Sequence, residues 1–163
     1  QPCLVPKSSA ISKLEGGTNM IIIDSDFTGR TYFSGPGAGG GPTASAIISD
    51  VVDIVRGNIL PVFGTAAKKL KKLEKGTKEI DRCYYLRLSL VDKPGALAQV
   101  ATVLGNNNIS IDRMKQKAHD GNLAPVLIVT HETTLKRVKK AIMEINALEV
   151  CIKTPISIKI EEM

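Results

Sequence analysis

The order of strands and helices over residues 82–161 restricts the fold more than any other feature of this chain. Leu86, Leu88 and Leu90 are separated by single polar residues, a period of two that predicts a strand with one buried face. The segments that follow are predicted as helix, strand, strand, helix and strand, at 97–104, 109–117, 123–130, 135–145 and 150–160. This β-α-β-β-α-β order predicts a ferredoxin-like α+β fold, in which two helices cover one face of an antiparallel sheet.

Turn and capping residues support these boundaries. The pair Asp120–Gly121 predicts a hairpin turn, and Thr133 or Thr134 is predicted to cap the second helix. Pro155 interrupts the last segment and indicates an edge strand or a bulge. Because the other face of so small a sheet is open, we expect a second copy of the chain to cover it or to extend the sheet.

The first 57 residues contain too little regular structure to enclose a core. Strands are predicted over 19–24 and 30–34, followed by a helix from an N-cap at Thr43 to about Arg56. The helix carries an apolar stripe formed by Ile47, Ile48, Val51, Val52 and Val55. A hairpin with one helix cannot bury that stripe alone, so we expect its packing partner to come from outside this block.

Between the hairpin and this helix lies a stretch with five glycines within residues 35–41. Gly35, Gly37 and Gly40 match the G-x-G-x-x-G pattern of dinucleotide-binding folds. That pattern requires a second parallel strand and an acidic residue about 20 positions on, and neither is predicted here. A P-loop is excluded because no Lys-Ser or Lys-Thr pair follows the glycines. The residues alone leave two interpretations open: a tight structural turn, or a turn that faces a cofactor.

The net charge of +6 is concentrated in one connector, predicted over residues 58–81. Without six lysines of this stretch the chain is formally neutral; they are Lys68, Lys69, Lys71, Lys72, Lys75 and Lys78. A nucleic-acid-binding protein is the alternative interpretation, but it favours a basic face spread over a fold and aromatic residues for base stacking. We therefore predict a solvated linker and no nucleic-acid partner.

Other site classes have little support. His119 and His131 are predicted to be surface residues, so no catalytic histidine, catalytic triad or metal site is predicted. Three cysteines without a C-x-x-C pair favour a reducing cytoplasm over a disulfide framework. No run of about 18 apolar residues is present, so we expect no membrane partner.

Three segments resemble the end of the catalytic region of the homoserine dehydrogenase family: PCLVP at residues 2–6, Gly17–Asn19, and GPGAGGGPTASAIISD at residues 35–50. The resemblance implies that the glycine turn lies beside NAD(P) in the full-length parent. The cofactor-binding residues would be Gly37, Ala38, Gly39 and Thr43. The family's nucleotide-binding domain and its hydride-transfer residues would lie upstream. It follows that this segment alone is expected to bind no cofactor and to be inactive.

Three further segments resemble an ACT domain, a module that senses amino acids: YYLRL at 84–88, VDKPGAL at 91–97 and NISI at 108–111. An amino-acid carboxylate suits the N–H groups at the start of the first helix, and the ammonium would need an acceptor such as Asp92 or Asn108. In the alternative interpretation Asp92 only caps that helix and Pro94 starts it. The predicted effector-binding residues are Val91, Asp92, Pro94, Gly95, Ala96, Leu97, Asn108 and Ile109.

Together the resemblances predict three segments: 1–57 as the end of a catalytic and dimerisation region, 58–81 as a lysine-rich linker, and 82–163 as an ACT domain. The predicted function is the C-terminal regulatory portion of a homoserine dehydrogenase, with L-threonine as feedback effector. A homodimer or higher homo-oligomer would form through the ACT sheet and the catalytic-region strands. The alternatives are a stand-alone ACT module without catalysis and the ACT portion of another amino-acid-pathway enzyme.

Overall fold

The computed structural model describes residues 2–58, 61, 63–72, 79–116 and 123–161. Its internal contacts divide the chain into a C-terminal unit, made of Gln1–Pro6 and Thr77–Met163, and an N-terminal unit, Lys7–Gly76. The sequence placed its boundaries after residues 57 and 81. The main difference is that the first six residues belong with the C-terminal unit.

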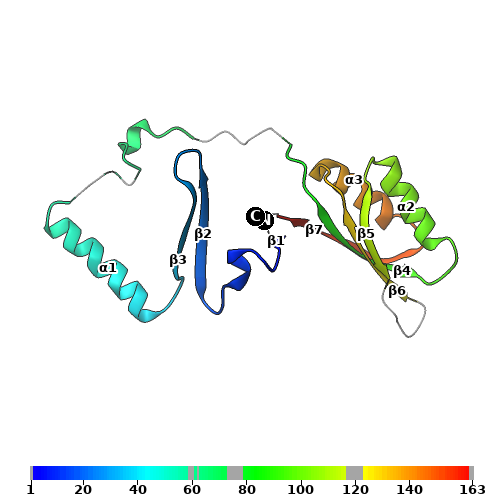
Figure 1. Cartoon of the computed structure of the whole chain (residues 1–163), viewed down its shortest axis with the longest axis horizontal. Helices are drawn as coiled ribbons and strands as arrows, with labels where there is room; N and C mark the ends of the chain where they lie inside the picture. Colours follow the sequence, from blue (N-terminus) through cyan, green and yellow to red (C-terminus); the bar gives the residue numbers. More distant parts are fainter. Residues whose placement is uncertain (1, 59–60, 62, 73–78, 117–122, 162–163) are drawn as a thin grey trace. The chain divides into compact units, whose positions relative to one another are not determined.

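The C-terminal unit is a five-stranded sheet with two helices on one face (Figure 1). The strand order across the sheet is β1-β7-β4-β6-β5. The predicted order of strands and helices over residues 82–161 and the ferredoxin-like fold are confirmed. The strands are β1 Cys3–Leu4, β4 Tyr84–Val91, β5 Ile111–Gln116, β6 Leu123–Thr130 and β7 Cys151–Ile160, and the helices are α2 Ala96–Asn106 and α3 Leu135–Asn146.

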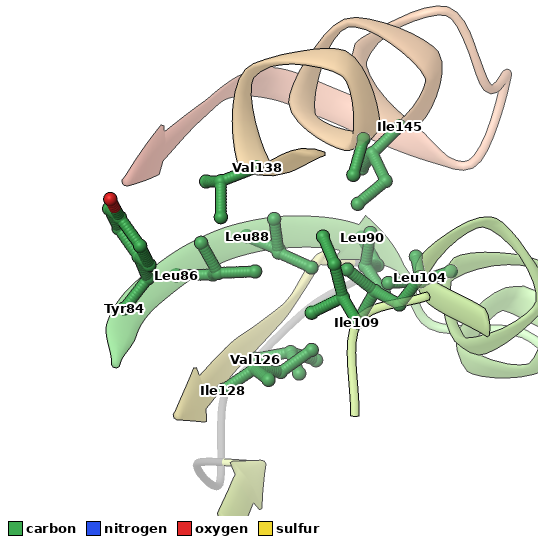
Figure 2. Close-up of a cluster of buried hydrophobic side chains, with 12 residues drawn as sticks. Tyr84, Leu86, Leu88, Leu90, Leu104, Ile109, Val126, Ile128, Val138 and Ile145 are labelled. Carbon is green, nitrogen blue, oxygen red and sulfur yellow. The ribbon is translucent and has the colours of Figure 1, made fainter. Parts of the chain in front are cut away.

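The core of this unit lies between the sheet and the two helices. Every second residue of β4 is buried, with Leu86 fully buried and Leu88 and Leu90 each 1% exposed, which confirms the alternation predicted from the sequence. Figure 2 shows these side chains meeting those from the helices and β6. The other main contributors are Val100, Leu104, Ile109, Val126, Ile128, Val138, Ala141 and Ile145. Thr134 caps α3 by accepting a hydrogen bond from the Arg137 N–H at 3.3 Å. It is one of the two residues predicted as this cap.

Strand β7 is flanked by β1 only at its C-terminal end and is irregular. It pairs antiparallel with β4, and the register shifts on either side of Ser89. Pro155 falls in this irregular stretch, where a residue without an N–H does not break a regular ladder. The predicted bulge is therefore confirmed. The edge-strand alternative also holds at Pro155, because β1 pairs with β7 only at Lys159 and Ile160 and leaves the stretch around Pro155 at the edge of the described sheet.

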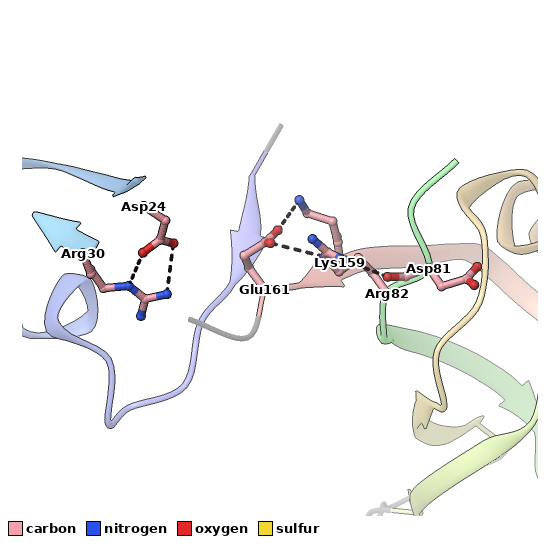
Figure 3. A network of polar contacts seen from close by, with 6 residues as sticks. All are labelled: Asp24, Arg30, Asp81, Arg82, Lys159 and Glu161. Carbon is pink, nitrogen blue, oxygen red and sulfur yellow. Dashed lines mark hydrogen bonds and ion pairs between the residues drawn. The ribbon is translucent and has the colours of Figure 1, made fainter. Parts of the chain in front are cut away.

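The N-terminal unit consists of a hairpin and one long helix. The hairpin is formed by β2, Thr18–Ser25, and β3, Gly29–Pro36. A bidentate ion pair between Arg30 and Asp24 joins its strands at 2.6 and 3.0 Å (Figure 3). The helix is α1, Gly40–Val55. Short 3-10 turns lie at η1, Ala10–Lys13, and η2, Ala67–Lys69.

No hydrophobic side chain of the described part of the N-terminal unit is buried. The apolar stripe of α1 is open, with Ile47, Ile48 and Val51 between 49% and 60% exposed. Ile21 of β2 and Phe33 of β3 are 63% and 56% exposed. The expectation that this block encloses no core of its own is confirmed.

Helix α1 begins earlier than the sequence predicted. Its N-cap is Gly39, and the Thr43 N–H donates to the Gly39 carbonyl oxygen at 3.1 Å. The predicted N-cap at Thr43 is therefore wrong. Pro42 fits inside the first turn because the N–H that proline lacks would have no intrahelical partner there.

An ion-pair network holds the end of β7 against the start of β4 (Figure 3). The Glu161 carboxylate accepts a hydrogen bond from Arg82 at 3.2 Å and also contacts the Lys159 ammonium. The backbone of Arg82 bonds in both directions with Thr133, each time at 3.0 Å. Lys159, followed by Arg82, lowers the pKa of Glu161 below its ordinary value of 4.5.

This lowered pKa predicts a loss of stability in acid. Because the folded protein binds the Glu161 proton less tightly than the unfolded chain, the stabilisation is present above pH 4.5 and is lost as the pH falls through the folded pKa. We expect the free energy of unfolding to decrease from about pH 5 to about pH 3, as measured by urea denaturation. The decrease should be smaller in Glu161→Gln and unchanged in Glu149→Gln, a substitution of an exposed residue. Equal slopes in all three proteins would contradict the assignment.

Several sequence predictions lie outside the described residues. They include the hairpin turn at Asp120–Gly121, His119, and Lys75 and Lys78 of the linker. The linker lysines that are described, Lys68, Lys69, Lys71 and Lys72, are all exposed. Among the described residues, no helix combines the length and apolar character needed to cross a membrane.

Candidate functional site

The glycine turn is held in place by the hairpin that precedes it. The Gly37 N–H donates to the Gly17 carbonyl oxygen at 2.8 Å. A Cβ added at Gly37 would lie 2.2 Å from Nδ2 and 2.5 Å from Cγ of Asn19, so the Asn19 side chain would have to move if Gly37 were replaced. Asn19 stands opposite Gly35 in the hairpin register. Asn19 was predicted as the start of a strand, but its packing against Gly37 was not predicted from the sequence.

Gly39 is needed for its backbone conformation. Its φ of 125° and ψ of 149° belong to a region of backbone conformations that is essentially restricted to glycine. This conformation turns the chain from the end of β3 into α1 within three residues, 37–39. The first-turn N–H groups of α1 have no intrahelical acceptor, and no acidic side chain lies in that turn.

The structure places the four predicted cofactor residues in one exposed segment. Gly37, Ala38 and Gly39 form the turn, and Thr43 lies in the first turn of α1; all four are exposed. Open backbone without bulky side chains, next to a helix N-terminus, can approach a polar or anionic ligand closely. The sequence interpretations of a structural turn and a ligand-facing turn are compatible here, because Gly37 packs on Asn19 while the helix start stays open.

The second candidate is the loop between β4 and α2. Gly95 is the N-cap of α2 and has a left-handed φ of 83°. The Ala96 N–H donates to the Lys93 carbonyl oxygen at 3.2 Å, and the Lys93 N–H donates to the Val91 carbonyl oxygen at 3.0 Å. These bonds fold the loop tightly over the start of the helix.

This geometry corrects the capping alternative. Gly95 rather than Asp92 occupies the N-cap, and the helix starts at Ala96 rather than at Pro94. Asp92, Pro94 and Gly95 are exposed, Val91 and Leu97 are half-buried, and Ala96 is buried. The exposed members surround the N-terminus of α2, where a carboxylate is electrostatically favoured.

The remaining predicted effector residues lie at the other end of α2. Asn108 is exposed and has a left-handed φ of 53°, whereas Ile109 is 4% exposed and belongs to the core. Helix α2 has 11 residues, which correspond to about 16 Å. One free amino acid is too short to contact Asn108 and the Asp92–Gly95 loop of the same chain at once.

A shallow pocket of about 360 Å³ lies beside Asn108. Its wall combines amide side chains from the end of α2 with basic side chains from the start of α3. The lining residues are Glu79, Asn106, Asn107, Asn108, Thr134, Lys136, Arg137 and Lys140. Asn107 is 5% exposed and is fixed by hydrogen bonds from its Nδ2 to the Val103 carbonyl oxygen at 2.9 Å and to Glu144 Oε2 at 2.6 Å.

The other titratable groups do not form a second site. His131 is exposed, as predicted, and its N–H donates to the Ser110 carbonyl oxygen at 2.9 Å. Within the described ranges, no group of three or more His, Cys, Asp or Glu residues is arranged to hold a metal ion. The described part of the chain therefore offers two candidate regions, the glycine turn and the ends of α2.

Comparison with known families gives a separate match for each half of the chain. Residues 1–52 match the homoserine dehydrogenase family, and residues 84–150 match the ACT domain family. The glycine turn lies in the first match, and the β4–α2 loop and Asn108 lie in the second.

Individual relatives match almost the whole chain. A homoserine dehydrogenase from Neisseria gonorrhoeae is 36% identical over 96% of this chain, and one from Helicobacter pylori is 35% identical over 98%. The crystal structure of a homoserine dehydrogenase from Thiobacillus denitrificans matches 99% of the chain with a TM-score of 0.82 and 32% identity. The chain spans 38% of the length of each of these three proteins.

Proposed function

We propose that this chain, which matches the C-terminal part of homoserine dehydrogenases over nearly its whole length, is the regulatory C-terminal portion of such an enzyme. The full-length parent would interconvert L-homoserine and aspartate semialdehyde with NAD(P). The observation that carries this proposal is the presence of both matches, to the dehydrogenase and to the ACT domain, in one chain. The test is NAD(P)-dependent oxidation of L-homoserine by the full-length protein that contains this segment, and absence of that activity would contradict it.

In this proposal the glycine turn forms part of the cofactor-binding surface. NAD(P) would supply the hydride acceptor. Gly39 and the first residues of α1 would present backbone N–H groups to its polar atoms, because Gly39 has no side chain and the first N–H groups of a helix have no intrahelical acceptor. Asn19 would keep the turn in position by packing against Gly37. The exposed stripe of α1 would pack against the catalytic region of the parent.

We propose further that the ACT domain binds an amino-acid effector, L-threonine, between two copies. The separation of about 16 Å between the two ends of α2 supports this arrangement. Asp92–Gly95 of one copy and Asn108 of another could meet the same ligand, whereas those of one copy could not. Strand β5 would bring the copies together, because it forms the edge of the sheet opposite β1.

Calorimetric titration with L-threonine tests the effector assignment. We expect saturable heat for the wild-type chain and at least about tenfold weaker binding for Asp92→Ala and for Asn108→Ala, because each would lose a hydrogen bond to a charged ligand group. Asn146→Ala, at the end of α3, is the matched control and should bind as the wild type does. No heat at millimolar L-threonine would contradict the effector identity. Loss of binding in only one of the two variants would contradict the shared site.

A further inference from the structure

The ACT sheet contains chain segments from both sides of the N-terminal unit. Strand β1 precedes that unit and β4 follows it, and both belong to the same sheet. In β1, Cys3 pairs with Lys159 and Leu4 with Ile160. The Glu161 N–H completes the contact by donating to the Leu4 carbonyl oxygen at 2.9 Å. The N-terminal unit is therefore attached to the sheet at both of its ends.

The two attachments differ in length. From Leu4 to Lys7, where the N-terminal unit begins, there are three residue steps, which span at most about 11 Å. From Gly76, where that unit ends, to Tyr84, where β4 begins, there are eight residue steps, which span at most about 29 Å. Because the connection through β1 is the shorter of the two, a displacement of β1 acts more directly on the N-terminal unit than a displacement of β4 does.

Strand β7 connects β1 with the candidate effector loop. At its start, the Val91 N–H donates to the Val150 carbonyl oxygen at 2.8 Å, directly before Asp92. At its end, Lys159 and Ile160 pair with β1. The ten residues of β7 cover about 33 Å, so this one strand contacts the loop at one end and β1 at the other.

The β1 pairing is the shortest ladder of the sheet. It has two residue pairs, whereas β4 and β6 share seven, and neither residue of β1 is buried. A short, exposed ladder opens at a low free-energy cost. Release of β1 from β7 is therefore expected to cost less than opening any other ladder of the sheet. The Glu161 carboxylate contacts Arg82 and Lys159, while the Glu161 N–H donates to the Leu4 carbonyl oxygen. The side-chain contacts hold Glu161 in place and therefore favour the paired state.

We infer that the β1–β7 pairing is a regulatory contact. Ligand binding at the β4–α2 loop changes this pairing and, through it, acts on the N-terminal unit. The inference rests on the proposed effector function. A ligand that binds with different affinity to the paired and released states shifts the equilibrium between them by that difference. Because the segment from Leu4 to Lys7 is short, the shift changes the constraint on the hairpin that supports the glycine turn.

Two variants of Glu161 separate the backbone contact from the ion pairs. Glu161→Pro removes the N–H that donates to Leu4 together with the carboxylate, whereas Glu161→Ala removes only the carboxylate. Proline is acceptable at this position because residue 161 lies just beyond the end of β7. In the absence of ligand, amide exchange at Cys3–Val5 should be about tenfold faster in Glu161→Pro than in Glu161→Ala. Exchange at the core residues Leu86 and Ile128 should be equal in both. Equal exchange at Cys3–Val5 would overturn the pairing.

The same proteins are then titrated with L-threonine. In the wild type, we expect exchange over β2 and at Cys3–Val5 to change together on binding. In Glu161→Pro, which favours the released state, the response over β2 should be lost, and the affinity measured by calorimetry should change by the factor that separates the ligand's affinities for the two states. Binding without a response over β2 in the wild type, or a retained response in Glu161→Pro, would overturn the coupling. Calorimetry distinguishes the two failures, because absence of heat in every protein contradicts the effector assignment instead.

Discussion

Replacing Leu86 by alanine is expected to lower the free energy of unfolding of the C-terminal unit by about 2–5 kcal/mol. Leu86 is fully buried in β4, the strand that pairs with both β6 and β7. The substitution removes buried apolar surface and leaves a cavity, because strands on both sides prevent the site from collapsing. A loss of this size is comparable to a large part of the stability of a small domain.

Urea denaturation followed by far-ultraviolet circular dichroism measures this effect. Met143→Ala is the matched control: Met143 is of similar size and lies on α3, but it is 66% exposed. We expect that control to change the free energy of unfolding by less than about 0.5 kcal/mol. A loss below about 1 kcal/mol for Leu86→Ala would show that β4 is not the centre of the core.

Replacing Gly39 by alanine is expected to reduce the kcat/KM of the proposed full-length dehydrogenase for NAD(P) at least about tenfold. At φ 125° and ψ 149° an alanine is strained by about 1–3 kcal/mol, so the turn would adopt another conformation and move the start of α1. The effect depends on the proposed position of this turn beside the cofactor.

Gly40 provides the control for this substitution. It is the first residue of α1, and a Cβ added there meets no atom within 4 Å. Since alanine also has a higher helix propensity than glycine, Gly40→Ala should keep kcat/KM within about twofold of the wild type. Steady-state rates of L-homoserine oxidation, followed by the absorbance of the reduced cofactor, give both values. Equal losses in the two variants would mean that the helix start, rather than the Gly39 conformation, controls activity.

The sequence predicted the elements whose signal is local. The alternation over Leu86, Leu88 and Leu90 and the helical spacing around Val138 each report burial directly, because one face of the element meets the core. The exposed stripe of α1 was also predictable, because a hairpin with one helix cannot enclose it. In the candidate sites, Gly39 and Gly95 both have a positive φ, which favours glycine, and both lie in turns.

The features that the sequence did not reveal depend on distant partners or on competing local signals. A strand of two residues such as Cys3–Leu4 has no measurable periodicity, and its partner lies more than 150 positions away. The sequence predicted the start of α1 at Thr43 because threonine is a common N-cap. In the structure Gly39 is the N-cap, and the helix begins at the next residue. The separation of Asn108 from the Asp92 loop follows only from the length of α2.

The short β1 ladder also determines how the ACT sheet is protected against aggregation. Along β7, β1 covers only Lys159 and Ile160, so the backbone polar groups from Cys151 towards Ile158 face outwards as a strand edge. Such edges add further strands easily unless proline, charge or irregularity prevents it. Strand β7 has all three features: Pro155 is the proline, Lys153 carries the charge, and the shifts in register make the strand irregular. A shortened protein that lacks the first six residues would lengthen this edge by two positions, while Pro155 and the irregular stretch would still protect its middle against intermolecular β-pairing.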